Sequence, residues 1–294
     1  MAAAGVTFAE GTPCWIDVML PDLEAGKRFY GELFGWTYGA PAPPDRGSCT
    51  EALLDGGRVA ALVYKRDGRL PTAWTLYFAT PDAAATAGRV RAAGGQLVTE
   101  PLPPDEDGTT ATAVDPGGAA FGLWQPGTRP GAPTGFEVTH RPGSYVWTEV
   151  CTREKEAVDA FYTEVFGYGM HPTGGRERRE GAERKGSGAA QGRESTGATG
   201  AIGDTMVWTL PGESADDAHA IGARTMIDST YPVEMPAHFL VYFAVDGCDT
   251  AVRATTRLGG RTVEDPRDTP FGRRAVVVDN QGARFGVLDT STTV

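Results

Sequence analysis

Histidine is the first residue type to consider for chemistry in this chain, because most mononuclear metal sites in enzymes include at least one imidazole ligand. The sequence has only four histidines, His140, His171, His219 and His238. No two of them are spaced as HxH or HxxxH. Any metal site would therefore have to be assembled from residues that lie far apart in the chain.

Cysteine offers no ready-made site either. The four cysteines stand singly at positions 14, 49, 151 and 248, with no CxxC pair. This spacing predicts neither a zinc knuckle nor a dithiol redox motif. We expect buried free thiols.

The composition is that of an acidic globular protein. The chain has 294 residues, 40% of them hydrophobic, which is enough for two ordinary domains. A formal net charge of −11 argues against nucleic acid and anionic membranes as partners, since both need a basic surface. The N-terminus lacks the basic start and apolar run of a signal peptide, and no later run approaches the length of a membrane span. We expect a cytoplasmic protein, as a monomer or a homodimer.

An internal repeat organises the chain. Residues 14–36, CWIDVMLPDLEAGKRFYGELFGW, return 132 residues later as VWTEVCTREKEAVDAFYTEVFGY at 146–168. A second pair, 73–101 and 238–266, is offset by 165 residues, so 33 extra residues lie between 168 and 238. Most of them belong to the segment 173–203, rich in Gly, Arg, Glu and Ser, which we predict to be a flexible surface loop.

Within each copy the same order of elements occurs twice. Residues 12–20 alternate as a strand does, Pro21 and Asp22 open a helix at 23–34, and Gly35 ends it. Short strands are expected near 36–40, 49–55 and 58–64. The next unit has a strand at 73–80, a helix at 82–93 and strands near 96–100, 110–115 and 119–125. The chain therefore reads as four βαβββ units in two pairs.

This organisation resembles the vicinal oxygen chelate superfamily, which includes glyoxalase I, extradiol dioxygenases and bleomycin-resistance proteins. The resemblance rests on PDLEAGKRFYGELFGW, on the strand and helix that end in Ala-Ala-Gly-Gly, and on the endings VDPGGAAFGLWQPG and VDNQGARFGVL. It implies an α+β fold in which each pair of units forms one cupped mixed sheet around a cavity. The expected domains are 10–127 and 143–291, joined by a linker at 128–142.

The resemblance also indicates where metal ligands would lie, on the first strand of each unit and on the closing strand of each pair. In this sequence those positions hold only aromatic residues or glycine: Trp15, Trp74 and Gly122 in the first copy, and Trp147, Phe239 and Gly286 in the second. His238 is one residue away from such a position, and strand alternation would point it out of the cavity. We expect no metal and no other cofactor.

The aromatic residues at these positions suggest a binding surface. If alternation holds, Trp15, Trp74 and Trp124 face one cavity, while Trp147 and Phe239 face the other. Their rings could stack on a flat ligand, and the glycines at 122 and 286 would leave room for it. The alternative is that these rings simply fill the core.

Two carboxylates, Asp17 and Glu149, lie two residues beyond Trp15 and Trp147 and should share the cavity face. Each could accept a hydrogen bond from a ligand, or act as a general base if burial raised its pKa. The alternative is a structural carboxylate bonded to backbone or to an arginine of the sheet.

These features favour a metal-free binding protein for a planar hydrophobic natural product, such as an anthracycline or another aromatic polyketide. It would act in self-resistance, or beside a biosynthetic oxygenase as its partner. The alternative is an enzyme of antibiotic metabolism, a hydroxylase, dioxygenase or lyase, with no catalytic residue assigned. In a third possibility one cup binds the ligand, the other supports it, and the 173–203 loop covers a pocket.

Overall fold

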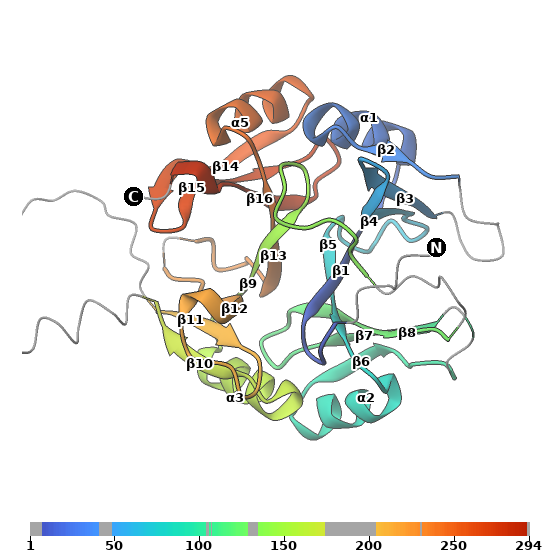
Figure 1. Cartoon of the computed structure of the whole chain (residues 1–294), viewed down its shortest axis with the longest axis vertical. Helices are drawn as coiled ribbons and strands as arrows, with labels where there is room; N and C mark the ends of the chain where they lie inside the picture. The colour runs from blue at the N-terminus through green and yellow to red at the C-terminus, as the bar shows by residue number, and fades with distance from the viewer. Residues whose placement is uncertain are drawn as a thin grey trace, which may run out of the picture.

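Two eight-stranded mixed sheets make up the protein, one from each half of the chain (Figure 1). The computed structural model describes residues 8–40, 49–103, 106, 108–128, 135–173, 204–229 and 231–292. The predicted insertion therefore falls outside the described residues, apart from Thr173. The strand orders are β2-β3-β4-β1-β5-β8-β7-β6 and β10-β11-β12-β9-β13-β16-β15-β14, which match unit for unit. The α+β prediction of four βαβββ units in two cupped sheets is confirmed.

The elements follow the repeat. The first half comprises β1 (Pro13–Leu20), α1 (Leu23–Phe34), β2 (Thr37–Tyr38), β3 (Cys49–Leu54), β4 (Gly57–Tyr64), β5 (Trp74–Ala79), α2 (Ala83–Ala92), β6 (Gln96–Thr99), β7 (Gly108–Val114) and β8 (Ala120–Pro126). The second half comprises β9 (Tyr145–Thr152), α3 (Lys155–Phe166), β10 (Gly169–Pro172), β11 (Thr205–Thr209), η2 (Asp217–His219), β12 (Ala220–Met226), β13 (His238–Ala244), α5 (Cys248–Arg257), β14 (Arg261–Thr269), β15 (Gly272–Val278), β16 (Arg284–Asp289) and η3 (Thr290–Thr292).

Local sequence sets where the helices begin and end. The side chain of Asp22 accepts a hydrogen bond from the backbone N–H of Ala25 and so caps α1. Gly35 ends that helix with φ of 74°, a left-handed conformation that glycine adopts without a Cβ clash. Gly167 ends α3 with the same φ. The repeated Phe-Gly pair is thus a helix-stop signal.

Each sheet has two faces with different roles. In β1, Ile16 and Val18 share one side of the strand with their partners Leu76 and Trp74, and Trp15 and Asp17 lie on the opposite side with Tyr77 and Thr75. Ile16 and Val18 are completely buried in the main hydrophobic core. We call the first side the core face and the second the cup face, here and in the matching strand β9. Residues paired across antiparallel strands share a face, so the register assigns each residue of the central strands to the core face or the cup face.

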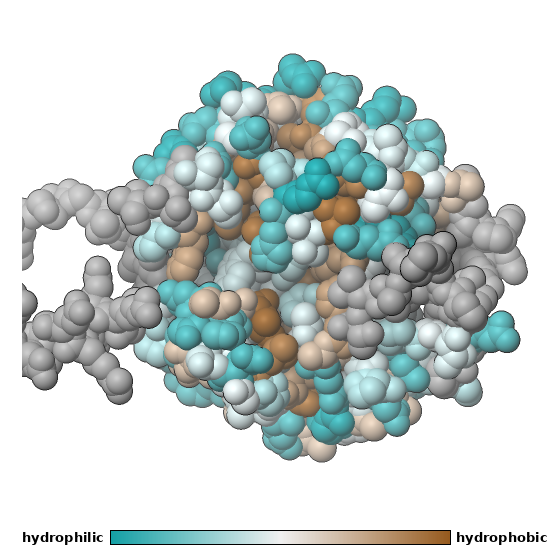
Figure 2. Space-filling model, in the orientation of Figure 1, coloured by the Kyte–Doolittle hydropathy of each residue, from teal (hydrophilic) through white to brown (hydrophobic). Residues whose placement is uncertain are grey.

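The two sheets pack with their core faces toward each other, and the helices lie around this junction (Figure 1). Helix α1 contacts α5, and α2 contacts α3. Rings from both halves interlock: the centroid of Phe34 lies 4.8 Å from that of Phe243, and Phe78 lies 5.2 Å from Phe166. Hydrophilic residues cover the outer ends of the molecule, where these helices lie (Figure 2). One continuous core therefore spans both halves, and the cups open away from it.

Two buried tyrosines tie the halves together in a reciprocal way. The Tyr30 hydroxyl on α1 donates to Asp279 Oδ2 at 2.8 Å, in the turn before β16. The Tyr162 hydroxyl on α3 donates to Asp115 Oδ2 at 3.2 Å, in the matching turn before β8. Each half thus supplies one donor and one acceptor across the junction.

Among the residues that the structure describes, no helix has the length and apolar character needed to cross a membrane. All four cysteines are free thiols, as the sequence predicts; Cys14 and Cys248 are buried, and Cys49 and Cys151 are partly buried.

Candidate functional site

The cup of the second sheet encloses a cavity of about 640 Å³. Its wall is formed mainly by β9 and β12, with one or two residues from each of β11, β13, β14, β15 and β16. Phe8, Pro13 and His140 contribute from outside that sheet. Thr173 and Thr205, at the two ends of the insertion, also line it. This volume falls in the range of small-molecule sites, about 300–1,000 Å³. The cavity is the candidate functional site.

Aromatic and aliphatic side chains form one part of its wall. Trp147 on β9 is partly exposed to the cavity, and Tyr242 on β13 lies beside it in the register. Val146, Ile221 and Leu288 add aliphatic surface. A flat ring could therefore contact the exposed part of Trp147, whereas Tyr242 is only 1% exposed.

A buried ion pair crosses the same wall. Arg274 Nη1 on β15 donates to Glu149 Oε1 on β9 at 2.8 Å, and the Thr225 hydroxyl donates to Glu149 Oε2 at 3.3 Å. Burial works most strongly against the charged form of Arg274, but the interactions with Glu149, Tyr242 and Glu264 together outweigh it, and the net shift of the pKa of Arg274 is upward. Glu149 therefore matches the structural alternative from the sequence, a carboxylate bonded to an arginine of its own sheet.

The glycines at 122 and 286 do not leave room for a ligand, which corrects the prediction. A Cβ built on Gly286 would lie 2.1 Å from the ring of Tyr242, and one on Gly122 would lie 2.1 Å from Tyr77. Each tyrosine ring lies directly over its glycine. The space is already occupied by a side chain from the neighbouring strand.

The first cup also has a tryptophan, a tyrosine and a carboxylate on its cup face, but their contacts differ from those of the second cup. Trp15 is only 7% exposed, and its ring packs 6.3 Å from Trp124 and 5.8 Å from Phe136. The Tyr77 hydroxyl donates to Asp17 Oδ2 at 2.7 Å. Aromatic side chains thus cover the cup face here, and Trp15 is packed as core would be.

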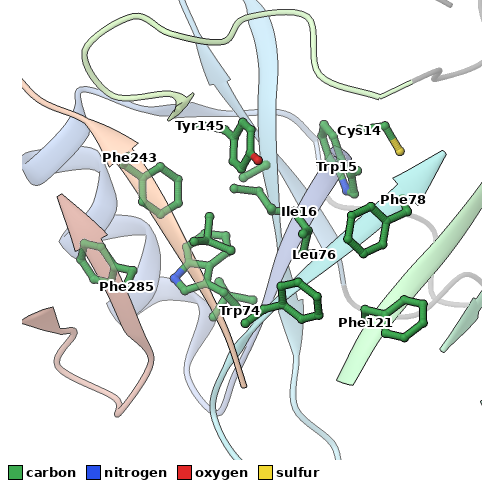
Figure 3. Packing of buried hydrophobic residues seen from close by; sticks show 14 of the residues in the cluster. Cys14, Trp15, Ile16, Trp74, Leu76, Phe78, Phe121, Tyr145, Phe243 and Phe285 are labelled. Carbon is green, nitrogen blue, oxygen red and sulfur yellow. The ribbon is translucent and has the colours of Figure 1, made fainter. Parts of the chain in front are cut away.

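Trp74 and Phe239 lie on the core face, so the prediction that they line the cavities is wrong. Trp74 pairs with Val18 and Phe239 with Val150, both core residues. The ring of Trp74 lies 5.0 Å from that of Phe243, and Figure 3 shows it among the rings of the junction. The assumed register was one residue out, which reverses the face of every side chain on the strand.

The same shift reverses the expectation for His238. It pairs with Cys151 on β9, two residues beyond Glu149, and therefore shares the cup face. Its Nδ1 lies 2.9 Å from the carbonyl oxygen of Pro236. Burial lowers the pKa of His238, so the imidazole is neutral near pH 7.

The residues present do not fit a metal ion of the kind that the resemblance implies. At the centre of the second cup the three adjoining strands present Glu149, Leu240 and Gly286, and the single carboxylate is held by Arg274. Across the described part of the chain, no three His, Cys, Asp or Glu side chains gather closely enough to hold a metal. The second cup therefore offers at most one free metal ligand among the described residues, whereas catalytic metal sites use three protein ligands.

Arg274 and Tyr242 are the site residues that sequence reasoning missed. Arg274 belongs to the strand GRRAVVV, where a charge within a buried run is itself a signal of a buried partner. Tyr242 and Tyr77 occupy matching places in the repeat, each paired with a glycine on the closing strand. The recurrence of this tyrosine and glycine in both copies could have identified both tyrosines.

Asp17 leads to a pH prediction. Burial raises its pKa from 3.8 to about 6, against the lowering effect of hydrogen bonds from Tyr77 and Thr75. A raised pKa in the folded state stabilises the fold at low pH, and this contribution is lost as pH rises through about 6. We expect the stability of the wild type, relative to Asp17→Asn, to fall between pH 4 and pH 7. Urea midpoints of both proteins across that range test this, and a constant difference would contradict it.

Comparison with known proteins places the chain among others of the same organisation. A family model for a glyoxalase-like domain matches residues 15–124. The anthracycline biosynthesis protein DnrV of Streptomyces peucetius is 34% identical, over 96% of this chain and 94% of the relative. The putative glyoxylase CFP32 of Mycobacterium tuberculosis (strain CDC 1551 / Oshkosh) is 31% identical, over 96% of this chain and 95% of the relative.

Solved structures share the fold at low sequence identity. The 2,3-dioxygenase LapB from Pseudomonas sp. KL28 is similar with a TM-score of 0.57 and 14% identity, over 95% of this chain and 92% of that one. The Mn(II)-bound glyoxalase from Novosphingobium aromaticivorans has a TM-score of 0.55 and 15% identity, over 98% and 87%. These likenesses support the tandem architecture.

Proposed function

This chain belongs to the glyoxalase-like vicinal oxygen chelate superfamily, and on that premise we propose that it is a metal-free binding protein whose second cup holds a planar aromatic small molecule. The observation that carries the proposal is the cavity of about 640 Å³, with Trp147 on its wall and an ion pair at its centre where a metal would be held. The wall combines aromatic and aliphatic side chains with threonine hydroxyls and charged groups.

The size and lining of the cavity favour a polycyclic ligand. Trp147 offers a partly exposed ring surface, and Leu288 and Ile221 add apolar contacts. Stacking on aromatic side chains adds about 0.5–1.5 kcal/mol for each ring pair beyond simple burial. A flat molecule of several fused rings uses this surface better than a flexible one.

The relatives narrow the ligand class. DnrV and the DauV protein of Streptomyces sp. (strain C5) are both named anthracycline biosynthesis proteins, and DauV is 35% identical to this chain. We therefore propose an anthracycline-like aromatic polyketide as the ligand. The protein would sequester it for self-resistance, or remove it as the product of a biosynthetic oxygenase partner.

Binding fits the geometry better than general-base catalysis. Glu149 is held by Arg274 and Thr225, so both of its carboxylate oxygens are engaged within the sheet. Asp17 has a raised pKa, but it accepts a hydrogen bond from Tyr77 in the cup that Trp15 and Trp124 cover. Both carboxylates are thus engaged by protein groups, whereas a general base needs a free oxygen within hydrogen-bond reach of the proton that it takes.

Calorimetric titration with a panel of planar polycyclic compounds tests this proposal. We expect Trp147→Ala to weaken binding by about tenfold, equivalent to about 1.4 kcal/mol, because it removes one stacking surface. The matched variant Trp15→Ala, in the other cup, should keep the parent affinity. The proposal fails if no compound binds, if both variants bind like the parent, or if purified protein contains one equivalent of Fe, Mn, Zn or Ni.

A further inference from the structure

The hydroxyl of Tyr242 is a buried polar group without a hydrogen-bond partner. The residue is 1% exposed, its side chain lines the cavity, and its OH contacts no acceptor among the described residues. Buried hydroxyls are satisfied in the great majority of native structures, because an unpaired one costs free energy. Such a group at a cavity wall is a candidate for ligand recognition.

The repeat provides an internal comparison for this hydroxyl. Tyr77 is the matching residue of the first cup, and its ring lies over Gly122 as that of Tyr242 lies over Gly286. The Tyr77 hydroxyl, however, donates to Asp17 at 2.7 Å. The same side chain in the same place is therefore satisfied in one cup and unsatisfied in the other.

The difference follows from two residue changes between the copies. Asp17 is replaced by Glu149, and Thr110 is replaced by Arg274 at the matching position on the adjacent strand. Arg274 takes up the carboxylate of Glu149, and its guanidinium lies 5.4 Å from the centroid of the Tyr242 ring. Glu149 therefore bonds to Arg274 and does not accept a hydrogen bond from Tyr242.

Arg274 contributes a second unused donor at the same place. Its Nη1 binds Glu149, but its Nε is buried and has no hydrogen-bond partner in the described structure. Burial also raises the pKa of Tyr242 well above its usual value, so the hydroxyl keeps its proton. One O–H donor, from Tyr242, and one N–H donor, from Arg274, are thus left without partners at this wall. Glu149 already balances the positive charge of Arg274.

Resting on the proposed function, we propose that the ligand of the second cup is an oxygenated planar polycycle, with a carbonyl or phenolic oxygen on its edge that accepts hydrogen bonds from Tyr242 and Arg274. The acceptor is neutral, because Glu149 already balances the guanidinium. The first cup is not a second copy of this site, since its tyrosine is satisfied internally. A plain aromatic hydrocarbon would leave both donors unpaired and bind more weakly.

Two probes that share an outline and a carboxylate separate these ideas: anthraquinone-2-carboxylate, which has two carbonyls on its central ring, and anthracene-2-carboxylate, which has no ring carbonyl. We expect the parent protein to prefer the quinone by about 10- to 100-fold, as the loss of one or two buried hydrogen bonds implies. Tyr242→Phe should lose most of this preference and retain its affinity for the anthracene. Tyr77→Phe should keep the preference.

Stability supplies an independent readout for the same variants. Because the Tyr242 hydroxyl has no partner in the protein, Tyr242→Phe should not lower the urea midpoint of the unliganded protein, whereas Tyr77→Phe should. If the parent binds both probes equally, or Tyr242→Phe keeps the preference, the inference is overturned and the proposed function stands. If the parent binds neither probe, the proposed function itself is overturned.

Discussion

Replacing Glu149 with leucine is expected to lower the free energy of unfolding by about 3 kcal/mol, the lower end of the cost of breaking a buried ion pair. The side chains of Glu149 and Arg274 are only 8% and 18% exposed, so the variant leaves a guanidinium in the sheet without its closest partner. Glu264, at 4.0 Å from Arg274 Nη2, compensates in part and places the value at this lower end. Urea denaturation followed by tryptophan fluorescence measures it.

A rescue variant separates the ion pair from simple loss of packing. Removing both charges, as Glu149→Leu with Arg274→Leu, should recover most of the stability, because an apolar pair needs no desolvation. Glu32→Leu is the matched surface control, since Glu32 pairs with Arg257 and these side chains are 54% and 64% exposed. It should cost less than about 1 kcal/mol. Equal effects at positions 32 and 149 would show that burial of the pair does not matter.

The second large effect is expected at the junction between the halves. Tyr30→Phe and Tyr162→Phe each remove a hydroxyl that donates to a buried carboxylate, Asp279 or Asp115. Hydrogen bonds to charged groups contribute about 1.5–3 kcal/mol each, so the double variant should lose about 3–6 kcal/mol. The two bonds lie on different helices at opposite ends of the molecule, and their effects should therefore add (Figure 1).

Burial already raises the pKa of both Asp115 and Asp279, and the tyrosine hydroxyls are among the donors that offset it. Tyr38→Phe is the matched control, because its hydroxyl donates to the neutral carbonyl of Lys27 within one half. It should cost about 1 kcal/mol or less. Thermal unfolding of the single and double variants compares them, and a double variant as stable as Tyr38→Phe would contradict the prediction.

The repeat made the fold predictable, because each copy carries the same order of strand and helix and the same Phe-Gly stop. It did not make the faces of the central strands predictable. In AWTLYFA and HFLVYFA bulky residues occupy both faces, so no polar alternation distinguishes cup from core. Counting from the helix then placed Trp74 and Phe239 in the cups, where Thr75 and Leu240 belong.

The candidate site was predictable only in part for a related reason. Trp147 and Glu149 could be found from their distance to the Phe-Tyr of the helix, and the structure places both on the cavity wall. Arg274 lies 125 residues from Glu149, and their pairing depends on how β15 and β9 come together in the folded sheet. The bond between Tyr30 and Asp279 depends in the same way on docking of the first unit against the fourth. Long-range contacts of this kind leave no local pattern.

The tyrosine ring over each glycine limits which substitutions the cup can accept. The resemblance assigns a metal ligand to position 286, and any side chain there would collide with the ring of Tyr242. A carboxylate at position 286 could be accommodated only if Tyr242 were first replaced by a smaller residue. That first replacement would by itself open a void in the cup. The same order applies to Gly122 and Tyr77. In each half, a metal-ligating side chain at this position would therefore require two dependent substitutions.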